Sequence, residues 1–135
     1  MGAPDEWLYE YALVRYVPCP ERGEFLNIGL VMMCKRRRWL RGMVMLDEER
    51  ILAFCPKAEL NQLRLQSSLF ERKDVPHPDL PVEEKYRWLT AVKSASLQIS
   101  PSHPAILNID AFPNNLSWEN LLNREFDRLF NLLVL

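Results

Sequence analysis

Three apolar runs in the first third of the chain, separated by polar turns, predict three consecutive strands. Tyrosine, leucine and valine are frequent in residues 8–17, and further apolar runs span residues 25–34 and 39–46. Such residues favour a pleated, half-buried surface, and short connections between them favour an antiparallel meander. The middle run is apolar at both its odd and its even positions, which predicts a central strand, because strand side chains alternate between the two faces.

From residue 47 onward, the spacing of apolar residues becomes that of α-helices. Asp47 is suited to cap a short helix that Pro56 ends, and Pro56 suits the first position of a second helix. Pro81 opens a third helix, and Ser117 caps an amphipathic C-terminal helix. Between these two helices, residues 97–100 are a candidate fourth strand, followed by a loop rich in proline and asparagine.

These elements predict an α+β fold, with an antiparallel meander sheet of three or four strands and helices packed mainly on one face. The length of 135 residues and a hydrophobic content of 48% suit a single domain over residues 1–135. Residues 1–46 supply its strand-rich part and residues 47–135 its helix-rich part. The apolar residues 132–135 are expected to pack on the sheet, the alternative being that a partner covers them.

Charge and cysteine content narrow the classes of function. The 17 basic and 18 acidic residues give a formal net charge of -1, so no global field indicates a nucleic-acid or membrane partner. Cys19, Cys34 and Cys55 match neither a disulfide framework nor a zinc pattern, which indicates a reducing compartment. With no secretory leader and no apolar run long enough to span a bilayer, we expect a cytoplasmic protein without membrane association.

The connection between the second and third predicted strands is the strongest local electrostatic feature. Five cations and an aromatic ring lie within seven residues, namely Lys35, Arg36, Arg37, Arg38, Trp39 and Arg41. Guanidinium groups pair with phosphates and tryptophan stacks on bases, so this basic hairpin is a candidate nucleic-acid interface. The alternative is a solvated hairpin tip whose charges discourage pairing between sheet edges.

A second polar cluster occupies the turn between the first two predicted strands, with Arg22, Glu24 and Asn27 as candidate ligand or partner contacts. Paired carboxylates can bind metals or exchange protons, but no third acidic ligand has suitable spacing, so ion pairs across the turn are the favoured interpretation. His77 and His103 lie in predicted loops, and neither is expected to be catalytic. Four glycines form no phosphate-binding loop, and we expect no metal and no cofactor.

Three strings of the sequence together resemble a known family. They are residues 11–18, residues 21–31 with the pattern Arg-Gly-Glu-Phe-x-Asn-x-Gly, and residues 125–130. They are similar to the bacterial domain of unknown function 3037, over nearly the whole chain. Members of that family are often encoded beside kinase-like proteins of the HipA type, so the resemblance implies a kinase-like partner. The family has no established catalytic residues, and the resemblance therefore supports the fold and leaves the chemistry open.

The leading functional prediction is a non-enzymatic protein-binding or regulatory module. It depends on the lack of a catalytic set, the apolar C-terminus and the family resemblance. One alternative is a nucleic-acid-binding module that uses the basic hairpin, and another is a small metal-dependent hydrolase or nuclease that uses Glu21, Glu24 and the histidines. A homo-oligomer formed through the sheet edge or the C-terminal helix is also compatible with the sequence.

Overall fold

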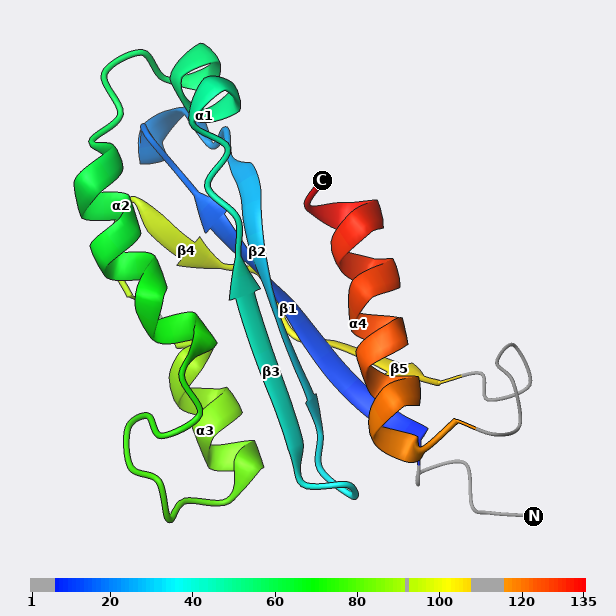
Figure 1. Ribbon diagram of the computed structural model, residues 1–135. Helices are drawn as coiled ribbons and strands as arrows, with labels where there is room; N and C mark the ends of the chain where they lie inside the picture. Colours follow the sequence, from blue (N-terminus) through cyan, green and yellow to red (C-terminus); the bar gives the residue numbers. More distant parts are fainter. Residues whose placement is uncertain (1–6, 92, 108–115) are drawn as a thin grey trace.

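A computed structural model describes residues 7–91, 93–107 and 116–135, which form an antiparallel sheet with helices on both faces (Figure 1). The strands are β1 (Leu8–Tyr16), β2 (Leu26–Cys34), β3 (Trp39–Val44), β4 (Leu97–Ile99) and β5 (His103–Ile106). The helices are α1 (Glu48–Phe54), α2 (Leu60–Ser67), α3 (Val82–Leu89) and α4 (Trp118–Leu133), with 3-10 turns η2 (Pro20–Arg22) and η3 (Ser68–Glu71). This architecture confirms the predicted α+β class.

The sheet is built around β1 and β2. Its order is β3-β2-β1-β4, so the first three strands form the predicted meander with β2 in a central position. Strand β1 pairs on its other edge with both β4 and β5: Val14 lies opposite Ile99, and Tyr9 lies opposite Ala105. Strand β4 confirms the candidate fourth strand.

Strand β5 lies where the sequence predicted only a loop, and that prediction is wrong. Its residue Pro104 lies opposite Glu10 of β1. Proline lacks the N–H group that a central strand needs, but it is tolerated on an edge strand, where one side of the backbone has no ladder partner. The sheet consequently has five strands instead of three or four.

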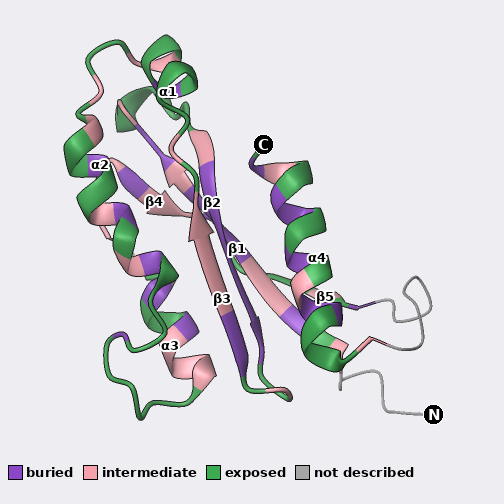
Figure 2. Ribbon diagram, in the orientation of Figure 1, coloured by how far each residue is buried: buried purple, intermediate pink, exposed green. Residues whose placement is uncertain are grey.

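Each face of the sheet has its own hydrophobic core, as the burial pattern shows (Figure 2). On one face, α4 packs Leu122 and Phe126 against strand residues that include Leu30. On the other face, α1, α2 and α3 pack together with η3 over residues that include Ile28 and Val31. Among the described elements, three helices thus share one face, as predicted, and α4 covers the opposite face, because β2 is apolar on both sides.

Two of the predicted helix starts are confirmed by their capping bonds. The Asp47 side chain accepts a hydrogen bond from the N–H of Arg50, and Ser117 does the same for Asn120 at the start of α4. The expected start of the second helix at Pro56 is wrong. Cys55 ends α1, and its carbonyl accepts a bond from Ala58, so that a turn precedes the start of α2 at Leu60.

The apolar C-terminal residues pack on the sheet only in part, because Leu132 and Leu135 are 68% and 60% exposed whereas Val134 is buried. Val134 is 2% exposed, and the Asn27 side-chain amide donates to the carbonyl of Leu133 over 3.1 Å. The Arg50 guanidinium donates to the carbonyl of Val134 over 2.7 Å. These two donors satisfy carbonyls that the end of a helix leaves unpaired. Within the described segments, none of the helices is both long and apolar enough to cross a membrane.

Candidate functional site

The basic hairpin exposes only part of its predicted interface. Lys35, Arg36 and Arg38 are exposed, and Arg38 takes the left-handed conformation, with φ of 50°, in the turn. Trp39 is only 6% exposed, and its ring meets Phe126 edge-on with 6.5 Å between ring centroids. Contrary to the sequence prediction, Trp39 therefore offers no exposed ring face on which a base could stack.

The other two arginines of the hairpin contact aromatic rings. Arg37 is half-buried, and its guanidinium lies 4.6 Å from the ring centroid of Trp7. Arg41 lies 4.2 Å from the ring centroid of Phe126, and its guanidinium also donates to Asp127 of α4 over 3.3 Å. Cation–ring contacts hold both side chains near the protein surface, and the ion pair with Asp127 adds to this for Arg41. The density of cations in the sequence thus overstates the charge that the hairpin presents to solvent.

The three candidates near the first turn do not form one site with the hairpin. Arg22 and Glu24 are exposed and form an ion pair with each other, as the favoured interpretation predicted. Asn27, in β2, instead donates to the carbonyl of Leu133 at the end of α4. The turn and the hairpin lie at opposite ends of β2 (Figure 1), so no single ligand of small size contacts both.

Arg22 and Glu24 nevertheless line one of two adjoining hollows, which together we name the trough. Its first part, of about 510 Å³, lies between the β1–β2 connection, with Pro18 and Cys19, and residues 53–57 at the end of α1. Its second part, of about 390 Å³, continues along α2. The two parts share three lining residues, Pro18, Cys55 and Lys57. Two adjoining hollows with shared lining residues are suited to a ligand that extends from one into the other.

The second part of the trough carries hydrogen-bonding side chains along α2. Gln62 and Gln66 both line it, and their spacing of four residues places them on the same side of the helix. A glutamine amide both donates and accepts hydrogen bonds. The buried Leu63 adds an apolar surface between them. This wall therefore combines apolar contact with polar groups of both kinds.

The described side chains that line the trough do not form an arrangement typical of catalysis. Burial and a hydrogen bond with the Cys55 thiol raise the pKa of Tyr16 to about 12, so the Tyr16 hydroxyl stays protonated at neutral pH. Neither histidine lines either part of the trough. In the part of the chain that the structure describes, no three His, Cys, Asp or Glu side chains are grouped to hold a metal ion.

Ser102 and His103 are neighbours in sequence but do not act on each other. The Ser102 hydroxyl is 2.6 Å from the hydroxyl of Tyr86, and it also donates to Glu10. The His103 ring contacts the ring of Tyr11 in a tilted arrangement, with 5.2 Å between the ring centroids. A serine nucleophile needs a histidine within hydrogen-bond reach, which this arrangement does not provide.

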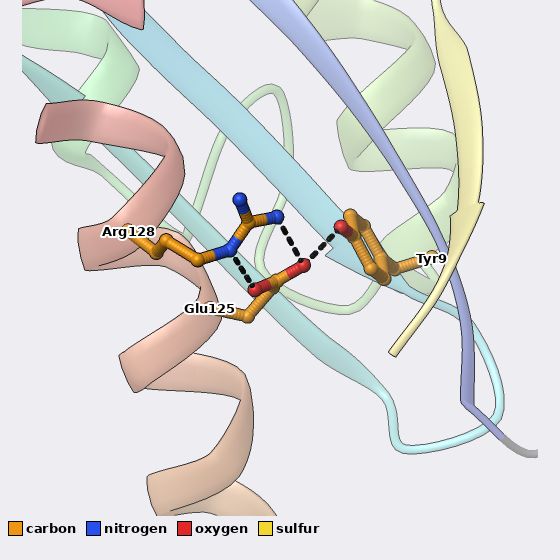
Figure 3. A network of polar contacts seen from close by, with 3 residues as sticks. All are labelled: Tyr9, Glu125 and Arg128. Atoms are coloured by element: carbon orange, nitrogen blue, oxygen red, sulfur yellow. Dashed lines mark hydrogen bonds and ion pairs between the residues drawn. The ribbon is translucent and has the colours of Figure 1, made fainter. Parts of the chain in front are cut away.

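Sequence reasoning missed a buried polar network that joins α4 to β1 (Figure 3). Arg128 donates two hydrogen bonds to the Glu125 carboxylate, at 2.7 and 2.9 Å, and the Tyr9 hydroxyl donates a third at 2.5 Å. Burial raises the pKa of Glu125, but the bonds from Arg128 and Tyr9 outweigh it and the net pKa is lowered. Burial and the bond to Glu125 raise the pKa of Tyr9. Because both carboxylate oxygens are occupied, we assign this network to the fold and not to a reaction.

Part of this network was visible in the sequence. Glu125 and Arg128 lie three residues apart within the string 125–130, which is the spacing of an ion pair on a helix. Tyr9 lies 116 residues before Glu125, and nothing local in the sequence connects the two.

Comparison with known proteins gives one match, and it is to a family. No curated protein and no solved structure matches the chain. The model of the family described as "Protein of unknown function (DUF3037)" matches residues 11–134, which is nearly the whole chain and includes the β1–β2 wall of the trough and α4. The resemblance that the three sequence strings indicated is thereby confirmed, and the chain belongs to the DUF3037 family.

Proposed function

We propose that the protein is a non-enzymatic binding module that holds an extended segment of a partner protein in the trough. The observation that carries this proposal is that the two hollows adjoin and share three lining residues, Pro18, Cys55 and Lys57. A compact ligand fills one concave pocket and needs convergent polar groups around it. Two adjoining hollows instead offer successive contacts, which suit a polypeptide in an extended conformation.

The chemistry of the trough wall supports a peptide as the ligand. Every residue of an extended chain carries an N–H donor and a C=O acceptor. Gln62 and Gln66 each offer both complementary groups, about 6 Å apart along one side of α2. Pro18 and Phe54 supply apolar surface in the first part of the trough, where side chains of the partner can be buried.

The kinase-like protein that the family resemblance implies is the first partner to test. The proposal places this interaction in the cytoplasm, in line with the expectation from the cysteine spacing. The trough lies at the end of β2 opposite the basic hairpin, so this function does not require the exposed cations Lys35, Arg36 and Arg38.

The proposal is tested by photo-crosslinking with a purified kinase-like protein of the HipA type, the partner that the family resemblance implies. A benzoylphenylalanine replaces Gln62 in one variant and Leu65 in the other. Leu65 lies on the same helix, is 76% exposed and does not line the trough. We expect a crosslinked complex from position 62 only. Equal crosslinking from both positions, or from neither, would contradict the proposal for this partner.

Calorimetry then measures the part played by the two glutamines. Gln62→Ala together with Gln66→Ala is expected to weaken binding about tenfold, since each lost hydrogen bond contributes about 0.5–1.5 kcal/mol. Asn61→Ala is the matched control, because Asn61 is exposed on α2 outside the trough. An unchanged affinity for the double variant would refute recognition along this wall.

A further inference from the structure

We infer that the segment held in the trough presents an acidic and a basic side chain at neighbouring positions, which meet Lys57 and Glu59. This inference rests on the proposed peptide-binding function and adds the charge pattern of the partner. It follows from how the charges that line the trough are distributed and from which of them already have partners.

Lys57 lies at the junction of the trough, because it lines both parts. Its side chain is exposed. Across the described ranges of the chain, no ion pair involves Lys57. The ammonium group carries three donors and is mobile on its long stem. It is therefore available to a carboxylate of a bound segment.

Glu59 supplies the opposite charge in the second part of the trough. It occupies the N-cap position of α2, where a side chain commonly accepts a bond from the helix backbone, yet it makes no such bond. Among the residues that the structure describes, Glu59 also takes part in no ion pair. Its carboxylate is thus free to accept from a lysine or arginine of the partner.

The remaining charges of the trough are already neutralised. Arg22 and Glu24 form an ion pair with each other at the far end of the first part. Along the trough, the uncompensated charges therefore consist of one cation at the junction and one anion beside α2. A segment with charges of a single sign would meet one attractive and one repulsive group, whereas a segment with one charge of each sign satisfies both.

The expected selectivity is modest because both groups are exposed to solvent. Exposed ion pairs contribute little each, so exchanging the two charges of the ligand should weaken binding about tenfold at low salt. The difference should shrink as salt screens the charges. Shape and backbone contacts provide the rest of the affinity and do not depend on salt to the same degree.

The test is selection from a displayed library of random 12-residue peptides on the full chain. The same library is selected on the double variant Lys57→Glu with Glu59→Lys, and on Glu71→Lys with Lys73→Glu as a control. Residues 71 and 73 are exposed, have the same spacing and opposite signs, and lie outside the trough. All the substituted residues are on the surface, and unchanged melting temperatures verify that each variant folds.

We expect peptides enriched on the native chain and on the control to carry neighbouring acidic and basic residues. A chosen peptide with its two charges exchanged should bind the native chain about tenfold more weakly and recover its affinity on the variant reversed at Lys57 and Glu59. Enriched peptides that need Gln62 and Gln66 but show no charge pattern would overturn the inference and leave the proposed function standing. Peptides that do not depend on these glutamines, or the absence of any enriched peptide, would overturn both.

Discussion

Replacing Glu125 by glutamine tests whether the buried network anchors α4 to the sheet. The side chain of Glu125 is 7% exposed, and its two oxygens accept three hydrogen bonds. Glutamine has nearly the same shape but places an NH2 group where Arg128 or Tyr9 donates. One donor then faces another donor in a buried position, where an unsatisfied polar group is costly.

The expected loss is about 2–3 kcal/mol in the free energy of unfolding at pH 7. A hydrogen bond to a charged group contributes about 1.5–3 kcal/mol, and the buried bond from Tyr9 belongs in this range. The side chain of Arg128 is 56% exposed, so solvent screens its ion pair with Glu125 and its contribution is discounted. Tyr9→Phe alone is expected to cost about 1.5 kcal/mol, and the two substitutions together less than the sum of their separate effects.

The effect of Glu125→Gln depends on pH in a defined direction. The pKa of Glu125 lies below its ordinary value of 4.5 in the folded protein, so the unfolded chain binds the proton more readily. The stability due to the ionised carboxylate is therefore complete above the ordinary pKa and is lost as the pH falls through the lowered pKa. The native chain and Glu125→Gln should differ most at neutral pH and converge in acid.

Urea denaturation followed by circular dichroism, at pH 7 and at several values below pH 4.5, measures these differences. Glu84→Gln is the matched control, because Glu84 forms an ion pair with Arg87 at the same spacing on an exposed helix face. That pair is expected to contribute about 0.5 kcal/mol at most. The reasoning is refuted if Glu125→Gln costs no more than Glu84→Gln, or if its cost does not decrease in acid.

Two further predictions concern a glycine and the cysteines. Gly42→Ala is expected to lower the free energy of unfolding by about 1–3 kcal/mol, because a Cβ there would collide with the backbone carbonyl of Phe70. Thermal unfolding measures this loss. An unchanged melting temperature would contradict the packing of η3 on β3. A disulfide reagent should label the exposed Cys19 first. Cys34, which is fully buried and whose pKa is raised by that burial, should react only on unfolding. Mass spectrometry of timed samples gives the order, and early labelling of Cys34 would contradict its burial.

The elements that the sequence predicted well are those whose signals are local. The meander depends on apolar runs rich in strand-favouring residues and on the polar turns between them. The starts of α1 and α4 depend on Asp47 and Ser117, each of which caps a backbone N–H three residues later. Strand β5 depends on pairing with β1 across more than 90 residues of chain, and Pro104 argues against it locally. A contact of that kind leaves no periodic pattern to detect.

The candidate site likewise contains contacts between sequence neighbours, which were predictable, and contacts made by tertiary packing, which were not. Arg22 and Glu24 are neighbours in sequence, and their ion pair was predictable from that spacing. Lys57 lines the same hollow as Arg22 and Glu24 only because the end of α1 packs beside the β1–β2 connection. Gln62 lines the second part of the trough, which also includes Lys57. The trough is thus a product of tertiary packing, and its lining could not be assembled from the sequence.

Two arginines of the basic hairpin, Arg37 and Arg41, differ from the charges of the trough because they already have partners within the fold. The hairpin contains more cations in sequence. Arg41 in β3 nevertheless lies against α4, where its guanidinium packs over the Phe126 ring and donates to Asp127. Lys57 and Glu59 lie outside regular strands, beside a helix start, and no contact in the described part of the chain neutralises either of them. A charge that the fold has already paired must break that contact before it binds a ligand, whereas an unpaired charge gives up only water. The two unpaired charges of the trough are therefore a better guide to a partner than Arg37 and Arg41 of the hairpin.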